Sequence, residues 1–323
     1  MTSMFASAPG KVVLCGEYAV LDGATAVSMA VDRRAAVKVS DFDGEWHRVS
    51  ARGYSSIEGR FIADGAITDW LQGEEEYRIV DTVWRSFGPT GNGCLSVELD
   101  SRAFADEISG EKIGVGSSAA LIVALAAALS ESSDVLDLAL RAHREFQQGA
   151  GSGVDVATAV SGGLIEYRMN PATIAPLQWP AGLAYRLVWT GIPASTPMKL
   201  DRLRKAGQRA SRTALASAAE TMAKAWRSAS AVLSEYPAYI ETLRRFNVDH
   251  DLGIFDAGHD QLVTEAAAAG LVYKPCGAGG GDVGILLGDS DERLDDFMNG
   301  RNAFGGRVLG CRLEPDGVEL ERR

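Results

Sequence analysis

Several features that would narrow the class of a protein are scarce in this sequence of 323 residues. Four cysteines are present, Cys15, Cys94, Cys276 and Cys311, with no CxxC pair and no histidine at the spacing of metal ligands. Such scattered thiols are typical of reduced cysteines in a cytosol rather than of disulfides or a zinc site. We therefore expect a cytoplasmic protein.

Positive charge is also scarce, because 32 lysines and arginines stand against 43 aspartates and glutamates, a formal net charge of −11. With no basic stripe to offset this charge, we expect no nucleic-acid partner. The longest apolar run, from about Ala119 to Leu129, is too short to cross a bilayer. The N-terminus lacks a basic segment followed by a long apolar one, so we expect neither a signal peptide nor a membrane partner. A few lysines could still bind a small anion locally.

The remaining composition is ordinary, with 46% hydrophobic and 23% charged residues. A chain of this length can form two domains, each with its own core. The prolines at 171, 176 and 180 mark a connection over residues 169–182. Periodicity predicts helices over residues 77–87, 119–129, 135–147, 201–234 and 237–246, and strands over residues 12–14, 35–39, 95–99, 163–168, 183–189, 271–273 and 283–287. We expect an α+β fold with domains at residues 1–180 and 181–323.

The most informative segment is Lys112-Ile-Gly-Val-Gly-Ser-Ser-Ala119, which opens a run of alanine and leucine. These residues are strong helix formers, and Ser117 or Ser118 is the expected N-cap. The preceding loop can direct N–H groups at an anion from the positive end of the helix. Gly114 and Gly116 would leave room for a phosphate. The segment lacks the Gly-Lys-Ser/Thr of a Walker A loop, and taken alone it is compatible with plain packing.

Two further glycine-containing segments accompany it: Ala8-Pro-Gly-Lys-Val-Val-Leu-Cys-Gly-Glu-Tyr-Ala-Val-Leu21 and Lys274-Pro-Cys-Gly-Ala-Gly-Gly-Gly-Asp-Val-Gly284. In this order, the three segments resemble the three motifs of the GHMP kinases, a family that includes galactokinase, homoserine kinase, mevalonate kinase and phosphomevalonate kinase. The resemblance extends to about Leu287. It implies a ribosomal-protein-S5-like N-terminal domain, a ferredoxin-like C-terminal domain and an ATP site in the cleft between them.

Finer details resemble the phosphomevalonate kinase branch. Lys112 stands two residues before the first glycine of its motif, and Tyr18 stands where mevalonate kinases usually carry histidine. The segments 151–157 and 189–196, and the Gly-Gly-Gly-Asp282 run, are also similar to that branch. This implies an ATP- and Mg²⁺-dependent transfer of phosphate to 5-phosphomevalonate, giving 5-diphosphomevalonate. Two alternatives stay open: a mevalonate kinase or another GHMP kinase acting on an alcohol, and a non-catalytic nucleotide-binding regulator.

The resemblance also assigns roles to individual residues, with Lys11 and Asp155 as the catalytic pair. The expected nucleotide-binding residues are Lys112, Gly114, Val115, Gly116, Ser117, Ser118 and Ala119. The expected residues that bind the phosphorylated small-molecule substrate are Glu17, Tyr18, Lys112, Ser152, Gly153, Ser195, Thr196, Gly277, Ala278 and Gly279. Ser118 and Glu145 are the expected Mg²⁺ ligands. The second is left open, because Arg144 aligns with the glutamate of mevalonate kinases.

The chemistry of such a reaction favours cationic and N–H groups over a general base. A phosphate acceptor has a second pKa of roughly 6 and is largely a dianion at neutral pH. Positioning and charge cancellation then dominate catalysis. Lys11 and Lys112 are the expected cations, with Lys274 and Lys199 as weaker candidates. In this setting Asp155 would orient Lys11.

Structural alternatives apply to most of these residues. Lys11 could be a solvated lysine, and Asp155 or Ser118 could cap a helix. Tyr18 could be a buried structural residue, while Ser195 and Thr196 could cap the helix that follows. The four histidines, which form no motif, are expected to be structural: His47, His143, His250 and His259. A monomer or a homodimer is expected.

Overall fold

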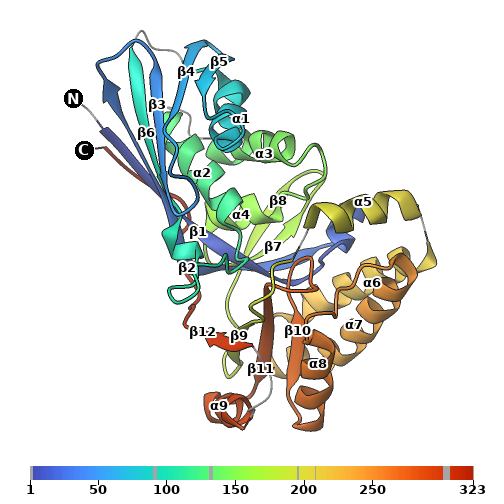
Figure 1. The fold of residues 1–323 in the computed structure, drawn as a ribbon. Helices are drawn as coiled ribbons and strands as arrows, with labels where there is room; N and C mark the ends of the chain where they lie inside the picture. Colours follow the sequence, from blue (N-terminus) through green and yellow to red (C-terminus); the bar gives the residue numbers. More distant parts are fainter. Residues whose placement is uncertain are drawn as a thin grey trace.

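The structure of the protein is a computed structural model that describes residues 3–89, 93–130, 134–194, 196–207, 209–300 and 306–322. Two β-sheets with helices packed on them confirm the predicted α+β fold (Figure 1). A single hydrophobic cluster contains residues of both halves, such as Val37 of the first sheet and Ile285 of the second. The sheets therefore share one core.

The first sheet has nine strands among the described residues, in the order β13-β1-β2-β6-β3-β4-β5, with β7 and β8 joined to it through β2. Its long second strand, β2, pairs with β1 along one edge and with two strands along the other, β7 at residues 26–29 and β6 at residues 36–42. The strands are β1 (Ser3–Cys15), β2 (Ala26–Phe42), β3 (His47–Arg52), β4 (Gly59–Asp64), β5 (Ile67–Gln72), β6 (Cys94–Asp100), β7 (Leu164–Arg168), β8 (Thr173–Leu177) and β13 (Glu319–Arg322).

Four helices cover one face of this sheet: α1 (Arg78–Phe87), α2 (Ser117–Leu129), α3 (Val135–Phe146) and α4 (Val154–Ser161). The central one, α2, packs against β1 and β2 as well as against α1, α3 and α4. It is buried on nearly every side. A helix that is apolar all round is stable only in such a position. Its burial fixes the start of α2 next to β1.

The second sheet is antiparallel, in the order β10-β11-β9-β12. Its strands are β9 (Ala184–Trp189), β10 (Val272–Pro275), β11 (Val283–Gly288) and β12 (Arg307–Leu309). The helices of this half are α5 (Thr196–Ala206), α6 (Ala210–Ala225), α7 (Ala229–His250), α8 (His259–Ala268) and α9 (Asp291–Asn299). The helices α6 and α7 pack against each other, and α8 packs against β10. Figure 1 shows these helices below α5.

The helix boundaries in residues 201–246 were predicted wrongly. A break was expected before Pro237, but α7 continues through that residue. The predicted helix 201–234 is instead interrupted twice, between α5 and α6 and again before α7. The second break includes Ser228, whose side chain accepts a hydrogen bond from the N–H of Ala231. Proline removes one helical hydrogen bond. Burial of Tyr236 and Tyr239 on either side of it favours the continuous helix.

Two strands depart from the predicted plan. The expected connection over residues 169–182 contains β8, which includes Pro176 and pairs only with β7 among the described strands. An edge strand tolerates proline because its outer side needs no N–H partner. The strand β13 pairs with β1, although its residues lie in the region 181–323 assigned to the second domain. Figure 1 shows the two ends of the chain close together.

The division of the chain into two domains near residue 180 otherwise stays a prediction.

Within the described ranges, no helix has the length and apolar composition needed to cross a membrane.

Candidate active site

The turn that leads into α2 is the candidate phosphate site. Gly116 precedes the helix in a left-handed conformation, with φ of 89°, and no side chain caps the first turn. The prediction of Ser117 or Ser118 as N-cap was therefore wrong, because the helix already begins at Ser117. The N–H groups of Ser117, Ser118 and Ala119 have no partner within the helix and lie at its positive end. An anion can bind there.

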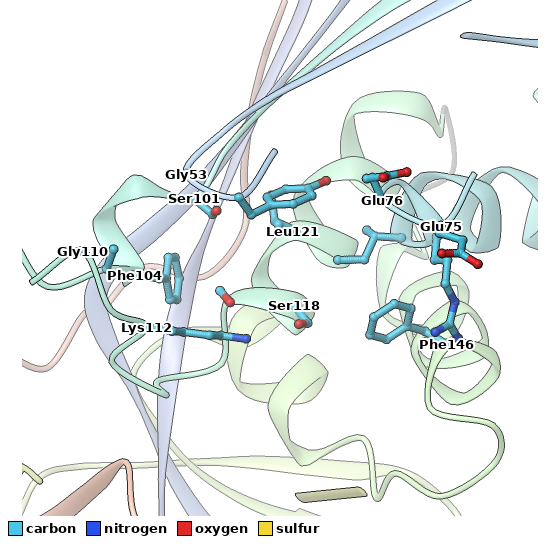
Figure 2. A pocket seen from close by; sticks show the side chains of 15 residues that line it. Gly53, Glu75, Glu76, Ser101, Phe104, Gly110, Lys112, Ser118, Leu121 and Phe146 are labelled. Carbon is cyan, nitrogen blue, oxygen red and sulfur yellow. The ribbon is translucent and has the colours of Figure 1, made fainter. Parts of the chain in front are cut away.

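A cavity of about 390 Å³ lies beside this helix start (Figure 2). Figure 2 shows Lys112 with Phe104 at one end, Phe146 with Glu75 at the other, and Ser118 between them. The other lining residues are Gly53, Tyr54, Glu76, Arg78, Ile79, Ser101, Phe104, Ala105, Gly110, Ser117 and Leu121. Aromatic walls with a few convergent polar groups are typical of small-molecule sites. The cavity suits a ligand with an apolar body and an anionic end.

Lys11 and Asp155 form an ion pair next to the same turn, with Lys11 Nζ 3.4 Å from Asp155 Oδ2. Lys11 comes from β1, and its N–H donates to the carbonyl of Val115. Asp155 comes from the first turn of α4, a favourable place for a carboxylate. Burial opposes ionisation of Asp155, but the charges of Lys11 and His143 outweigh it and keep the pKa of this carboxyl below its usual value. The predicted catalytic pair is therefore brought together.

The two glycines of the turn face side chains. An ideal Cβ on Gly116 would lie 3.1 Å from carbon atoms of Lys11, and one on Gly114 would lie 2.2 Å from Cγ of Asp282. Both glycines also have positive φ, which side chains rarely adopt. The prediction that they also clear space for a phosphate stays a prediction. They let Lys11 and Asp282 approach the turn.

A second cavity, of about 100 Å³, has the Lys11–Asp155 pair in its wall. Tyr18, Ser152, Gly277 and Ala278, which were predicted to bind the substrate, line it too. Its further lining residues are Val13, Glu17, Val20, Leu21, Gln147, Ala150, Gly151, Val154 and Leu200. We call it the acceptor cavity. Lys11 touches the turn at Gly116 and also lines the acceptor cavity, so it stands between the two predicted binding regions.

The loop over residues 277–281 adds N–H groups to this cavity. Gly277 and Ala278 have no acceptor for their N–H groups within the described part of the chain. Gly277 and Gly279 have φ of 63° and 66°. Backbone that alternates in this way forms anion-binding concavities. The N–H of Gly279, by contrast, donates to the carbonyl of Cys276, so this predicted substrate residue shapes the loop.

Gly153 was also predicted to bind the substrate, but it is needed for packing. It precedes α4 with φ of 82°. A Cβ there would lie 2.5 Å from Leu140 Cδ2. Its neighbour Ser152 accepts hydrogen bonds from the Val154 N–H at its Oγ and from the Tyr167 hydroxyl at its carbonyl.

Glu17 and Lys274 have a different position from the one expected. Their side chains form an ion pair that is closed to solvent, and Tyr239 donates to the other oxygen of Glu17 at 3.0 Å. Lys274, a weaker phosphate candidate, is fully buried and cannot reach an anion in the cavity. Glu17 contributes to the cavity wall, but its carboxylate is engaged elsewhere. The expected substrate contact of Glu17 is therefore corrected to a supporting role.

Tyr18 joins two of the predicted motifs. Its hydroxyl donates to the carbonyl of Ala278 at 2.6 Å, and burial raises its pKa well above the usual range. The backbone at Tyr18 has φ of 62°, an uncommon conformation for an aromatic residue. Tyr18 therefore lines the acceptor cavity, and its hydroxyl is already hydrogen-bonded to the loop 277–281.

Lys112 lines the large cavity and not the acceptor cavity, which favours its nucleotide role over its substrate role. Desolvation lowers the pKa of Lys112, and the like charge of Lys11 lowers it further. The opposite charge of Asp282 raises this pKa but does not outweigh the other two effects. Asp282, which we did not assign, has its pKa raised by burial. Its Oδ1 accepts from the N–H of Ala194 at 3.1 Å. The sequence signal was a non-glycine residue directly after three glycines.

The remaining predicted residues are less well supported. Glu145 is exposed on α3 and lines neither the large cavity nor the acceptor cavity. Glu75 and Glu76, which were not predicted, share the large cavity with Ser118. In the described ranges, no group of three or more His, Cys, Asp or Glu is placed to hold a metal ion. Ser195 lies outside the described residues, as does the side chain of Thr196, where α5 begins.

Known proteins resemble this chain along most of its length. A model of the GHMP kinases N terminal domain matches residues 77–163. A phosphomevalonate kinase of Streptomyces sp. (strain CL190) is 30% identical, over 89% of this chain and 90% of that protein. A mevalonate kinase of Thermococcus onnurineus is 25% identical over 98% of each.

A solved structure of Streptococcus pneumoniae phosphomevalonate kinase, in complex with phosphomevalonate and AMPPNP, has the same fold. Its TM-score is 0.76 at 16% identity, and the match covers 95% of this chain and 99% of that one. Fold and site together define a small-molecule kinase. The chain belongs to the GHMP kinase family. Kinases of this family use ATP.

Proposed function

We propose that this protein transfers the γ-phosphoryl group of ATP to 5-phosphomevalonate, giving 5-diphosphomevalonate and ADP. The observation that carries the proposal is the Lys11–Asp155 pair, which borders the turn before α2 and the acceptor cavity at once. The 30% identity to a phosphomevalonate kinase supports this acceptor. The 25% identity to mevalonate kinases makes mevalonate the second candidate.

ATP would occupy the large cavity. Its phosphates would meet the free N–H groups of Ser117, Ser118 and Ala119, where the helix dipole favours negative charge. Phe146, at the end of the cavity away from Lys112, offers aromatic surface for the base. Lys112, at the polar end, would add a cation to the phosphates.

Mg²⁺ fits the donors that are present. This ion is usually held by substrate phosphates with one or two protein oxygens, so it needs no preformed cluster of carboxylates. The Ser118 hydroxyl is half-buried in the cavity wall and caps nothing at the helix start. Ser118 would therefore hold the ion together with ATP. Bound there, Mg²⁺ would reduce the negative charge of the phosphates.

The acceptor would lie in the acceptor cavity, with its phosphate near Lys11 and the N–H groups of Gly277 and Ala278. Because the phosphate is already ionised, the reaction needs in-line positioning more than proton removal. Lys11 would offset the charge of the two approaching phosphates. Asp155 would hold the Lys11 ammonium in place through their ion pair.

A coupled ADP-release assay tests the proposal. The purified protein is given MgATP with 5-phosphomevalonate, mevalonate or a panel of sugars in parallel. We expect 5-phosphomevalonate to have the highest kcat/KM by a wide margin. Preference for mevalonate would establish the second candidate. Binding of ATP without turnover of any acceptor would instead favour a nucleotide-binding regulator.

A further inference from the structure

The ammonium of Lys199, on α5, donates hydrogen bonds to three backbone carbonyls, two of them in the loop 277–281 beside the acceptor cavity. Its Nζ donates to Gly279 at 2.6 Å, and to Gly253 and Ala278 at 3.2 Å each. An ammonium has three donors and no acceptor, so these three carbonyls use its full capacity. Lys199 was one of the two weaker candidates for a cation that binds phosphate. In the structure its ammonium is instead hydrogen-bonded to backbone carbonyls of the protein.

The helix that carries Lys199 also forms part of the acceptor cavity. Leu200, the next residue, lines that cavity together with Tyr18 and Gly277. Apart from the buried Leu203, the described side chains of α5 are half-buried or exposed. Figure 1 shows α5 at the edge of the molecule, above α6 and α7. A helix with so little buried apolar surface depends on specific polar contacts for its position.

The loop that Lys199 contacts is shaped for this approach. Gly280 has φ of 71°, and a Cβ there would lie 2.3 Å from Lys199 Nζ. The same Cβ would lie 2.4 Å from the carbonyl oxygen of Gly253, which is backbone and cannot swing away, so this contact and the positive φ favour glycine where the ammonium enters. The carbonyl of Ala278 also accepts from the Tyr18 hydroxyl. Two donors from distant parts of the chain thus hold the same peptide group, next to the free N–H groups of Gly277 and Ala278.

We propose that Lys199 is a positioning residue that ties α5 to the loop 277–281 and thereby sets the affinity for the acceptor. These hydrogen bonds would fix two parts of the acceptor cavity relative to each other: the side chain of Leu200 and the N–H groups of Gly277 and Ala278. Their effect falls on the acceptor and not on ATP, because none of these residues lines the large cavity. The identity of the acceptor rests on the function proposed above.

The charges around Lys199 make the tie sensitive to pH. Desolvation lowers the pKa of Lys199 to about 8, although Asp256 before α8 and Asp282 of the glycine loop favour its charged form. Arg202, on α5 itself, disfavours that form. The charged ammonium predominates below this pKa and is lost as the pH rises through it. The affinity for the acceptor should therefore fall above about pH 8.

Three variants of the full chain test the proposal: Lys199→Met, Lys199→Arg and the control Lys205→Met. Lys205 lies on the same helix, exposed and paired with Asp201. With 5-phosphomevalonate as the acceptor, we expect Lys199→Met to raise the acceptor KM about tenfold or more, as for a lost charged hydrogen-bond donor, and to leave the ATP KM unchanged. Lys199→Arg should recover part of this loss, and Lys205→Met should match the unsubstituted protein.

Two further measurements separate positioning from general damage. Between pH 7 and 9, the acceptor KM should rise in the unsubstituted protein and stay flat in Lys199→Arg. Backbone hydrogen exchange in residues 196–206 and 277–281 should be faster in Lys199→Met than in the unsubstituted protein. Lys205→Met should show no such increase. If Lys199→Met matches Lys205→Met in KM and exchange, the inference fails. If the exchange changes while the unsubstituted protein does not turn over 5-phosphomevalonate, the tie stands and the proposed acceptor is wrong.

Discussion

Glu17 and Lys274 are 257 positions apart in the sequence and form an ion pair that solvent does not reach. The hydroxyl of Tyr239 on α7 donates to Glu17 and accepts from the N–H of Gly16. Lys274 also donates to the carbonyl of Pro275. This cluster joins β1 and its following turn to β10 and α7. It links the two sheets directly behind the acceptor cavity.

The first prediction concerns the stability of this cluster. Lys274→Met leaves the Glu17 carboxylate buried without its cation, which typically costs about 3–5 kcal/mol. We expect a loss of that order in the free energy of unfolding, measured by denaturant titration. The double variant Glu17→Gln/Lys274→Met should recover a large part, since no unpaired charge remains. Equal stabilities for the two variants would show that the charge is not what makes the substitution costly.

The second prediction concerns Asp155. Asp155→Asn keeps the shape of the side chain but loses the charge that holds Lys11, so kcat should fall substantially. The pKa of Asp155 is lowered, so its carboxylate stays charged until the pH falls below the usual aspartate range. The kcat of both proteins, measured at saturating acceptor, should therefore follow ionisation of the acceptor, at about pH 6. Rate profiles from pH 5 to 9 test this. Recovery of most of the lost rate near pH 9 would identify Asp155 as a base and favour an alcohol acceptor.

The third prediction concerns Lys112, which lies at the polar end of the large cavity. Lys112→Ala removes a cation from the nucleotide phosphates, and we expect the ATP KM to rise roughly tenfold. The acceptor KM should change little. Steady-state kinetics with each substrate varied in turn will show the difference. A larger effect on the acceptor would restore the substrate role expected from the sequence.

The fourth prediction concerns Gly116. In Gly116→Val, the side chain would press on Lys11 and force a positive φ on a β-branched residue. We expect calorimetry on the folded variant to find no MgATP binding. Gly182→Val is the matched control, because Gly182 has φ of 79° but open space around its Cβ position. Normal ATP affinity in Gly116→Val would mean that the turn is only structural.

Much of the secondary structure was predictable from local pattern. The apolar run after Ser118 indicated α2, and the alternation in residues 95–99 indicated β6. The errors arose where neighbours in space decided the outcome. Pro237 continues a helix because flanking tyrosines are buried, and β8 contains a proline because it lies at a sheet edge.

The residues of the candidate site likewise fall into those predictable from a short segment and those that depend on contacts between distant segments. The motifs placed Lys11, Asp155 and the turn before α2 in one site, because glycine spacing and a helix start are properties of a short segment. Nothing local showed that Gly114 faces Asp282 or that Lys199 meets carbonyls of Gly253 and Gly279. These contacts join segments that are distant in the sequence.

The sequence by itself determined which chemical groups are present and which short segments can bind an anion. Only the tertiary structure decided which lysine borders a cavity and which is buried in the protein. Lys11 and Lys274 look alike as lysines beside glycine and proline, yet one borders a cavity and the other is fully buried. The physical reason is that the role of a charged side chain depends on its solvent exposure and on its nearest opposite charge. Both are set by packing between distant segments.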